Sequence, residues 1–152
     1  YSVITSPDRE SCVEEISVNR GLEESILAYY APLQERGITP EIDITPEQVI
    51  RRVDRGELSR VFSNLLNNAM KYSDGDLRIS LTPEGSITFS NSAAELSKIQ
   101  AERLFDRFYT IENARKSTGM GLSIAKVLVE RMGGTIEAEY SDGQLGIKII
   151  LP

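Results

Sequence analysis

The chain contains no histidine and no tryptophan among its 152 residues, and it has one cysteine, Cys12. Histidine is the usual base near neutral pH and a common metal ligand. Chemistry that needs an imidazole base, ligand or phosphoryl acceptor must therefore take it from another domain or protein. A single cysteine excludes a disulfide within the chain, and its reduced state suits a cytoplasmic location.

Long apolar stretches and an excess of positive charge are missing as well. No run approaches the ~20 residues that a membrane-spanning helix needs, and no signal peptide precedes the first charged residues. The formal net charge is −6, from 17 Lys and Arg against 23 Asp and Glu, which disfavours sequence-independent binding to nucleic acid. We therefore expect neither nucleic acid nor direct membrane contact for this chain.

The composition is that of a globular domain. Hydrophobic residues make up 40% and charged residues 26%, close to the averages for soluble proteins, and the length suits one domain. Because the chain begins with Tyr1 rather than methionine, we expect a fragment of a longer protein. Residues 1–12 show little periodicity and predict a linker, which leaves residues 13–152 as the domain.

Hydrophobic periodicity predicts an alternation of helices and strands. Asp54, followed three residues later by Glu57, is a capping-box pattern that begins the second long helix. Helices are predicted over 22–35, 54–72, 101–105 and 121–132, and strands over 41–45, 49–53, 77–82, 86–90, 135–140 and 145–151. This order favours the α+β class, a two-layer sandwich in which a mixed, mostly antiparallel sheet of about five strands packs on about three helices.

The helix over 54–72 carries an unusual polar face. At roughly 100° per residue, Asn64, Asn68 and Lys71 lie within about 60° of one another. Asparagine is a poor helix former, whereas its amide oxygen can bind a hard divalent cation and lysine can contact phosphate. The pattern favours a magnesium and phosphate site, with a solvated helix face as the alternative. The opposing apolar stripe, which predicts core packing, consists of Phe62, Leu65, Leu66 and Ala69.

A glycine-containing turn, residues 118–121, opens the last helix. Glycines allow the backbone to approach phosphate oxygens, and a helix N-terminus offers unpaired N–H groups to an anion. An ordinary loop-to-helix turn is the alternative. The polar run over 110–117 is a candidate lid, and Arg107 and Arg115 are candidates to neutralise the charge of a transferring phosphoryl group. As exposed arginines, both could equally take no part.

Three segments together resemble a known family. Residues 64–73, Asn-Leu-Leu-Asn-Asn-Ala-Met-Lys-Tyr-Ser, resemble the N box of the ATP-binding domain of sensor histidine kinases, in the gyrase, chaperone, kinase and mismatch-repair ATPase superfamily. Residues 104–109 resemble the F box and residues 117–126 the second glycine box, with Ser117 in place of its usual first glycine. The motifs follow the family's order and spacing over about residues 54–152. This resemblance implies the Bergerat-type ATP-binding fold.

The resemblance also implies roles for individual residues. Asn68 is the implied magnesium ligand, and Asn64 supports the metal and phosphate shell. Lys71 contacts phosphate, and Tyr72 packs beside the base and ribose. The catalytic set is Asn64, Lys71, Arg107 and Arg115. The other implied nucleotide-binding residues are Asn91, Phe108, Thr118, Gly119, Met120, Gly121 and Leu122.

The implied activity is that of a histidine protein kinase that binds Mg-ATP. In ATP-hydrolysing relatives the position of Asn64 is typically a water-activating glutamate, and an amide cannot accept a proton at neutral pH. The site would therefore hold ATP for a histidine on an upstream dimerisation and phosphotransfer domain, which residues 1–12 would join to this one. A response regulator is the further expected partner, and the parent protein is expected to be anchored in the cell membrane.

One family motif is altered. The first glycine box, Asp-x-Gly-x-Gly, should follow the strand over 86–90, where Asn91 takes the place of the aspartate and neither glycine is present. The aspartate normally accepts a hydrogen bond from the adenine amino group. An uncharged amide oxygen would do so at a cost of ~1 kcal/mol or more. Because an amide is both donor and acceptor, the sequence predicts weaker ATP binding and a smaller preference for ATP over GTP.

Two other functions remain open at this stage. One is a degenerate, nucleotide-free pseudokinase that docks a partner, which the altered glycine box would permit. The other is an anti-sigma-type serine kinase of the same superfamily. The aromatic F box and Tyr72 argue against the serine kinase.

Overall fold

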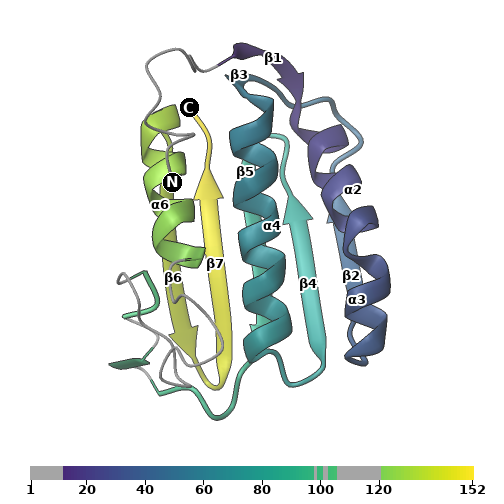
Figure 1. The fold of residues 1–152 in the computed structure, drawn as a ribbon, viewed down its shortest axis with the longest axis vertical. Coiled ribbons are helices and arrows are strands. Elements are labelled where there is room, and N and C mark those ends of the chain that lie inside the picture. The colour runs from purple at the N-terminus through teal and green to yellow at the C-terminus, as the bar shows by residue number, and fades with distance from the viewer. Residues whose placement is uncertain (1–11, 98, 101–102, 106–120) are drawn as a thin grey trace.

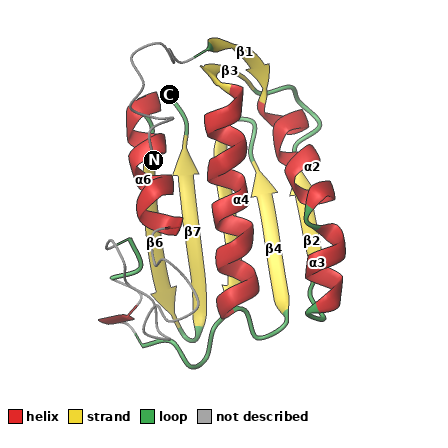
Figure 2. Ribbon diagram, viewed as in Figure 1, coloured by secondary structure: helices red, strands yellow, loops and turns green. Residues whose placement is uncertain are grey.

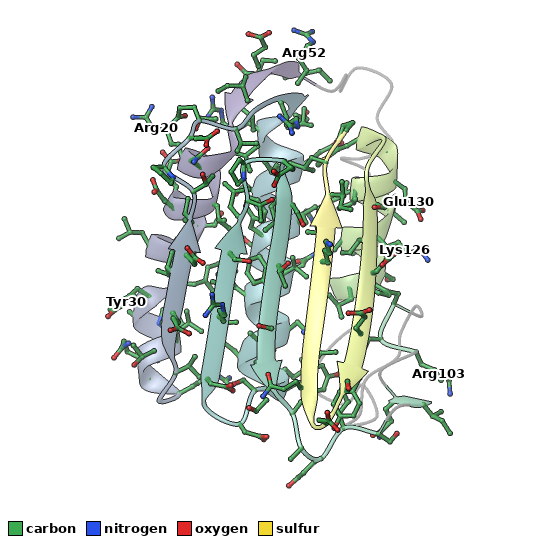
Figure 3. The ribbon with its side chains drawn as sticks, turned by 180° about the vertical axis from the view of Figure 1, so that it is seen from behind. Arg20, Tyr30, Arg52, Arg103, Lys126 and Glu130 are labelled. Atoms are coloured by element: carbon green, nitrogen blue, oxygen red, sulfur yellow. The ribbon has the colours of Figure 1, made fainter. Side chains whose placement is uncertain are left out.

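The computed structural model describes residues 12–97, 99–100, 103–105 and 121–152. Helices lie on one face of a five-stranded sheet (Figures 1 and 2). Within the described residues, the other face carries no helix and is lined by side chains (Figure 3). Arg78 on this open face contacts the carboxylates of Glu41 and Asp43, each at 3.3 Å.

The sheet is mixed, as predicted. The helices are α2 (Val18–Ala28), α3 (Tyr30–Glu35), α4 (Arg55–Tyr72) and α6 (Gly121–Met132). The strands, in spatial order, are β2 (Thr39–Ile44), β4 (Asp76–Leu81), β5 (Ser86–Ser92), β7 (Gln144–Ile150) and β6 (Thr135–Ser141). β2 runs parallel to β4, and the other neighbouring pairs are antiparallel. The predicted α+β two-layer sandwich is confirmed.

A small two-stranded sheet lies apart from the main one. In it β1 (Val13–Ser17) pairs antiparallel with β3 (Ile50–Asp54). The strand predicted over 49–53 agrees with β3 within a residue at each end, whereas no strand is predicted over 13–17. The reason is that Ile16 is the one fully buried position of β1, so the segment lacks an alternating apolar pattern.

The helix predicted over 22–35 is wrong in its bounds, because two helices occupy this stretch. α2 begins earlier, since the Ser17 hydroxyl accepts a hydrogen bond from the Arg20 N–H at 3.2 Å and caps the helix. Tyr29 then departs from helical geometry, with φ −102° and ψ 5°. Pro32 explains the break, because it has no N–H to donate and its ring crowds the carbonyl of residue 28.

The bounds of α4 agree with the sequence prediction. The Asp54 carboxylate caps the helix by accepting from the Glu57 N–H at 3.0 Å. The Glu57 carboxylate lies 3.1 Å from the Arg131 guanidinium of α6. Asp54 therefore caps α4, and Glu57 joins α4 to α6.

Apolar packing fixes α4 against the sheet. The predicted stripe of Phe62, Leu65, Leu66 and Ala69 is buried. The rings of Phe62 and Phe89 stack with centroids 6.4 Å apart, which joins α4 to β5. Burying a side chain of this size contributes about 1.5–3 kcal/mol, so the apolar face determines which way the polar face of α4 points.

We predict opposite effects on stability for two glycine substitutions. A Cβ at Gly134, between α6 and β6, would lie 2.5 Å from the backbone oxygen of Ile150, so Gly134→Ala should lower the free energy of unfolding by about 1–3 kcal/mol. A Cβ at Gly21 within α2 meets nothing within 4 Å, so Gly21→Ala should raise it by about 0.5–1 kcal/mol. Urea denaturation measures both. Equal stabilities for the two variants would contradict the packing described.

Candidate functional site

Asn64, Asn68 and Tyr72 lie along one line of α4, because residues four apart are neighbours on a helix surface. Asn68 is 7% exposed, and Asn64 and Tyr72 are half-buried. Glu57, which pairs with Arg131, marks this side of α4 as the one that faces α6. Two residues of the predicted polar face, Asn64 and Asn68, thus lie on the side of α4 that faces α6, whereas the third, Lys71, is exposed.

Asn67, the residue next to Asn68, lies on the other side of α4. Its side chain is exposed and donates a hydrogen bond to the Tyr29 hydroxyl at 3.3 Å, between α2 and α3. Lys71 is exposed in the last turn of α4. Adjacent asparagines thus have different surroundings, and Asn67 is a natural control for Asn68.

The Asn68 residue is mostly buried, but its amide makes no hydrogen bond in the described structure. Within the described part of the chain, this side chain has no hydrogen-bond partner. Every side-chain nitrogen or oxygen atom there that is itself buried does have a hydrogen-bond partner. The polar atoms of Asn68 must therefore reach an accessible surface. An amide in this state can donate to or accept from a ligand, or bind a cation through its oxygen.

Asn91 lies at the end of β5, on the face that packs against the helices. Side chains alternate across a strand, so Asn91 shares the face of Ile87 and Phe89, and it is 3% exposed. Its Nδ2 donates to the Ser92 carbonyl oxygen at 3.1 Å. The C-terminal end of α4 and the end of β5 lie at the same end of the molecule, and the N-terminus of α6 points toward that end (Figure 1).

The connection between α4 and β4 holds the backbone that follows Asn91. The Asp74 N–H donates to the Ser92 carbonyl at 2.9 Å, and the Asp74 carboxylate accepts from the Ala94 N–H at 2.8 Å. The Asp76 carboxylate accepts from the Ser92 N–H at 2.8 Å and from the Ser92 hydroxyl at 2.9 Å. Sequence reasoning missed this role of Asp74 and Asp76, because a Ser-Asp-Gly-Asp stretch reads as a turn.

The hairpin of β6 and β7 holds the same backbone from the other side. The Tyr140 hydroxyl donates to the Ala93 carbonyl at 2.8 Å, and the Ala93 N–H donates to the Gly143 carbonyl at 2.8 Å. Gln144 Nε2 donates to the Ser92 hydroxyl at 2.7 Å. Residues 92–94, where the family motif has its first glycine, are therefore fixed from two directions.

Part of the predicted site lies outside the described residues. Gly121 is the first residue of α6, and Leu122 is buried in its first turn. In the segment that resembles the F box, Leu104 is buried and Lys126 Nζ lies 5.8 Å from the centre of the Phe105 ring. The predicted lid over 110–117 and the predicted residues Arg107, Phe108, Arg115, Thr118, Gly119 and Met120 lie outside the described part.

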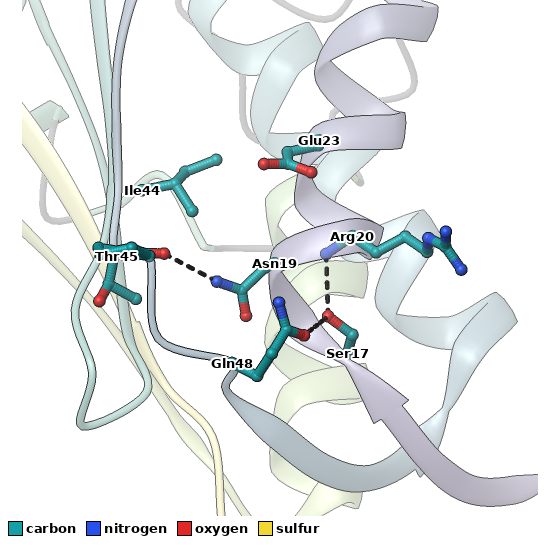
Figure 4. Close-up of a pocket in the computed structure, with 8 residues that line it drawn as sticks. Ser17, Asn19, Arg20, Glu23, Ile44, Thr45 and Gln48 are labelled. Carbon is teal, nitrogen blue, oxygen red and sulfur yellow. Dashed lines mark hydrogen bonds between the residues drawn. The ribbon is translucent and has the colours of Figure 1, made fainter.

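A cavity of about 480 Å³ beside the start of α2 is a different feature (Figure 4). Asn19, which lines it, donates to the carbonyls of Thr45 at 3.0 Å and Glu47 at 2.9 Å and accepts from the Val49 N–H at 2.8 Å. Through these three hydrogen bonds the Asn19 amide joins α2 to the segment between β2 and β3. We therefore assign Asn19 a structural role and place the candidate site between α4 and α6.

Neither a metal cluster of the usual kind nor a membrane span is found in the described residues. No three His, Cys, Asp or Glu side chains there could hold a metal ion together. None of the helices described is long and apolar enough to cross a membrane.

Comparison with known proteins places the chain in a family. Residues 53–152, more than half of the chain, match the model of the histidine kinase-, DNA gyrase B- and HSP90-like ATPases. The chain therefore belongs to this ATPase family, as the sequence analysis predicts.

Two similar curated proteins are a sensor histidine kinase and a sensor protein. The chain is 32% identical over 145 residues to the sensor histidine kinase YcbM of Bacillus subtilis, covering 90% of this chain and 47% of that protein. It is 35% identical over 133 residues to the sensor protein VanS of Enterococcus faecium, covering 82% of this chain and 34% of that protein. The chain thus spans less than half the length of either relative.

Solved structures share the fold. The catalytic domain of the histidine kinase ThkA has a TM-score of 0.79 at 21% identity, with 92% of this chain and 95% of that chain covered. The mycobacterial sensor histidine kinase MprB has a TM-score of 0.77 at 24% identity, with 92% and 97% covered.

We predict that Asp76 contributes stability that acid removes. Burial alone would raise its pKa, but hydrogen bonds from the Ser92 N–H, the Ser92 hydroxyl and Ser73 outweigh burial and lower the pKa below its ordinary value. A carboxyl whose pKa is depressed on folding stabilises the protein above its unfolded pKa of about 4, and this stability is lost as the pH falls through the folded value.

The test is urea unfolding of wild type, Asp76→Asn and Ser92→Ala from pH ~5 to ~2, the range around and below the unfolded pKa. Asp76→Asn should lose less stability with acid than wild type. Ser92→Ala removes one of the hydrogen bonds and should fall between the two. If the free energy of unfolding falls with pH in the same way for all three proteins, the Asp76 contacts do not contribute to the acid dependence of stability.

Proposed function

We propose that the chain is the ATP-binding catalytic domain of a two-component sensor histidine kinase. It binds Mg-ATP and transfers the γ-phosphoryl group to a histidine on a separate domain. The observation that carries the proposal is Asn68, a residue that is 7% exposed on the side of α4 that faces α6, and whose amide makes no hydrogen bond in the described structure. Family membership and the sensor kinase relatives support the same function.

The residues fit a magnesium ion bound together with nucleotide. Mg²⁺ in kinase-type sites is held by one or two protein oxygens, with phosphates and water as its other ligands. The Asn68 amide offers one such oxygen, and Asn64 lies one helical turn away. When bound, Mg²⁺ neutralises and bridges phosphate oxygens.

The nucleotide would lie beside the last turns of α4, on the side that faces α6. Tyr72 and Asn91 would contact the base end of the nucleotide, and Leu122 of α6 would lie beside the nucleotide. The N-terminus of α6 would point unpaired N–H groups toward the phosphates, through the turn formed by Thr118, Gly119, Met120 and Gly121. Lys71, Arg107 and Arg115 would supply positive charge for the transferring group, and Phe108 would contact the nucleotide.

The proposed reaction is transfer of the γ-phosphoryl group of ATP to a histidine of another domain. A histidine nitrogen of the phosphotransfer domain attacks the γ-phosphorus, the bond from that phosphorus to the bridging β,γ-oxygen breaks, and ADP leaves with the electron pair. Asn64 is an amide and cannot remove a proton from water at neutral pH, so transfer is favoured over hydrolysis. The phosphoryl group then passes to an aspartate of a response regulator. The domain would work on the cytoplasmic side of a membrane-anchored parent.

Asn68→Ala should abolish Mg-dependent ATP binding and leave the fold intact, since the amide contributes no hydrogen bond to the described structure. The matched control is Asn67→Ala, which removes the adjacent asparagine, about 100° around the helix, and should bind Mg-ATP as wild type does. Isothermal titration calorimetry with Mg-ATP compares the three proteins, and circular dichroism checks their folding. Unchanged affinity in a folded Asn68→Ala protein would rule out this residue as the metal ligand.

The isolated chain should not phosphorylate itself, because it contains no histidine. With [γ-³²P]ATP it should instead label a separately supplied helical domain from its parent protein that carries the acceptor histidine. The label should be lost in acid and stable in base, as expected of a phosphohistidine. Acid-labile label on the 152-residue chain alone would contradict the mechanism. Acid-stable label on a serine of the partner would favour the serine kinase.

A further inference from the structure

β2 is an edge strand of the main sheet, and one of its two sides is open. It is the outermost strand on one side of the sheet (Figure 3). In the described part of the chain, β4 pairs with its inner side and no strand pairs with its outer side. An open edge of this kind is a template for another strand.

The backbone of β2 alternates between these two sides. The Thr45 N–H, just after the strand, donates to the Leu81 carbonyl of β4 at 3.0 Å. Backbone groups of successive residues in a strand point in opposite directions within the sheet, so those of Ile44 and Ile42 point away from β4. Pro40, the next residue of this series, has no N–H to donate. The donors at the open edge are therefore the N–H groups of Ile42 and Ile44.

The two faces of β2 carry different side chains. Ile42 is level with Ile79 of the core, so it lies on the face that the helices cover, yet it is 47% exposed. Glu41 and Asp43 lie on the open face, where their side chains are 73% and 68% exposed. Because both carboxylates share the single guanidinium of Arg78, one negative charge is left in excess.

Apolar surface continues beyond β2 on the side of the helices. Ile44 lines the cavity beside the start of α2, so the edge remains open at this end of the strand (Figure 4). Tyr30 of α3 lies on the same side of the molecule and is 48% exposed (Figure 3). An added strand would therefore meet apolar side chains on one face and carboxylates on the other.

We propose that β2 binds an extended segment of a partner protein in which Lys or Arg alternates with apolar residues. The segment would extend the sheet by pairing with the outward backbone groups of Ile42 and Ile44. Its apolar side chains would pack beside Ile42. Its cations would lie beside Glu41 and Asp43 and neutralise the charge that Arg78 leaves.

A second copy of this chain is a poor occupant of the edge. β2 contains two carboxylates and neither Lys nor Arg, so pairing of two β2 strands would place like charges side by side. β6, at the other edge of the sheet, carries Glu137 and Glu139 and is equally unsuitable. Charged side chains and proline commonly protect edge strands from self-association. At β2 the same carboxylates that reject a copy favour a basic strand.

The probe is a capped peptide of about seven residues, within the usual length of a strand, in which lysine alternates with valine. Added to the ¹⁵N-labelled chain, it should shift the amide signals of β2 most and slow hydrogen exchange at Ile42 and Ile44. A peptide of the same composition, with its valines and its lysines in separate blocks, should bind at least several-fold more weakly. A peptide with glutamate in place of lysine should do the same.

Variants test the backbone and the charges separately. Ile42→Pro removes an outward N–H and keeps the hydrogen bonds between β2 and β4, so the chain should stay folded and lose peptide binding. Glu41→Lys combined with Asp43→Lys should weaken binding at least several-fold. The control with the same change in net charge, Glu137→Lys combined with Glu139→Lys on β6, should keep the wild-type affinity. Circular dichroism checks the folding of each variant.

Several results would overturn the proposal. These are shifts centred on another element, equal binding of the alternating and block peptides, and unchanged binding to folded Ile42→Pro. Self-association of the chain through β2, seen by sedimentation with the same amides protected, would identify a second copy as the occupant instead. If Ile42→Pro does not fold, hydrogen exchange at Ile42 and the charge variants decide, and an unchanged value in either overturns the proposal.

Discussion

The contact between Phe62 of α4 and Phe89 of β5 sets the rotation of α4 about its own axis. The stacked rings lie between the two layers, and with this face held against the sheet, helical geometry turns Asn64 and Asn68 toward α6. The same geometry turns Asn67 toward Tyr29. A rotation of α4 by one residue, about 100°, would bring Asn67 into the surroundings that Asn68 now has. Apolar packing therefore places the amides that we assign to the metal and the phosphates.

Polar contacts fix the two ends of the site along the helix axis. At one end Glu57 joins α4 to Arg131 of α6. At the other end Asp74 and Asp76 bind the backbone after β5, so the position of Asn91 is tied to the end of α4. Where the family pattern has glycine after the adenine-binding residue, this chain has side chains and a backbone held by hydrogen bonds. The altered motif is therefore compatible with an ordered nucleotide site.

Sequence patterns predicted the elements that bury one regular face, and they failed where tertiary contacts decide. The bounds of α4 and α6 followed from apolar periodicity and from Asp54, whereas the break at Tyr29 depends on Pro32 within a continuous apolar pattern. The burial of the Phe62 stripe was predicted, and the placement of Asn68 against α6 agrees with its predicted polar face. The orientation of the Asn91 amide was beyond prediction, because it depends on a carbonyl that Asp74 holds from another element.

The central claim is that Mg-ATP binds between α4 and α6, with Asn68 at the metal. Paramagnetic relaxation in a ¹⁵N-labelled chain, with Mn²⁺ replacing Mg²⁺ in the nucleotide complex, tests this claim most directly. The account predicts that the signals of Asn68 and its neighbours in the last turns of α4 broaden most, while the signal of Asn19 in the cavity beside α2 is affected far less. Broadening centred on Asn19, or none at Asn68 when nucleotide is bound, would contradict it.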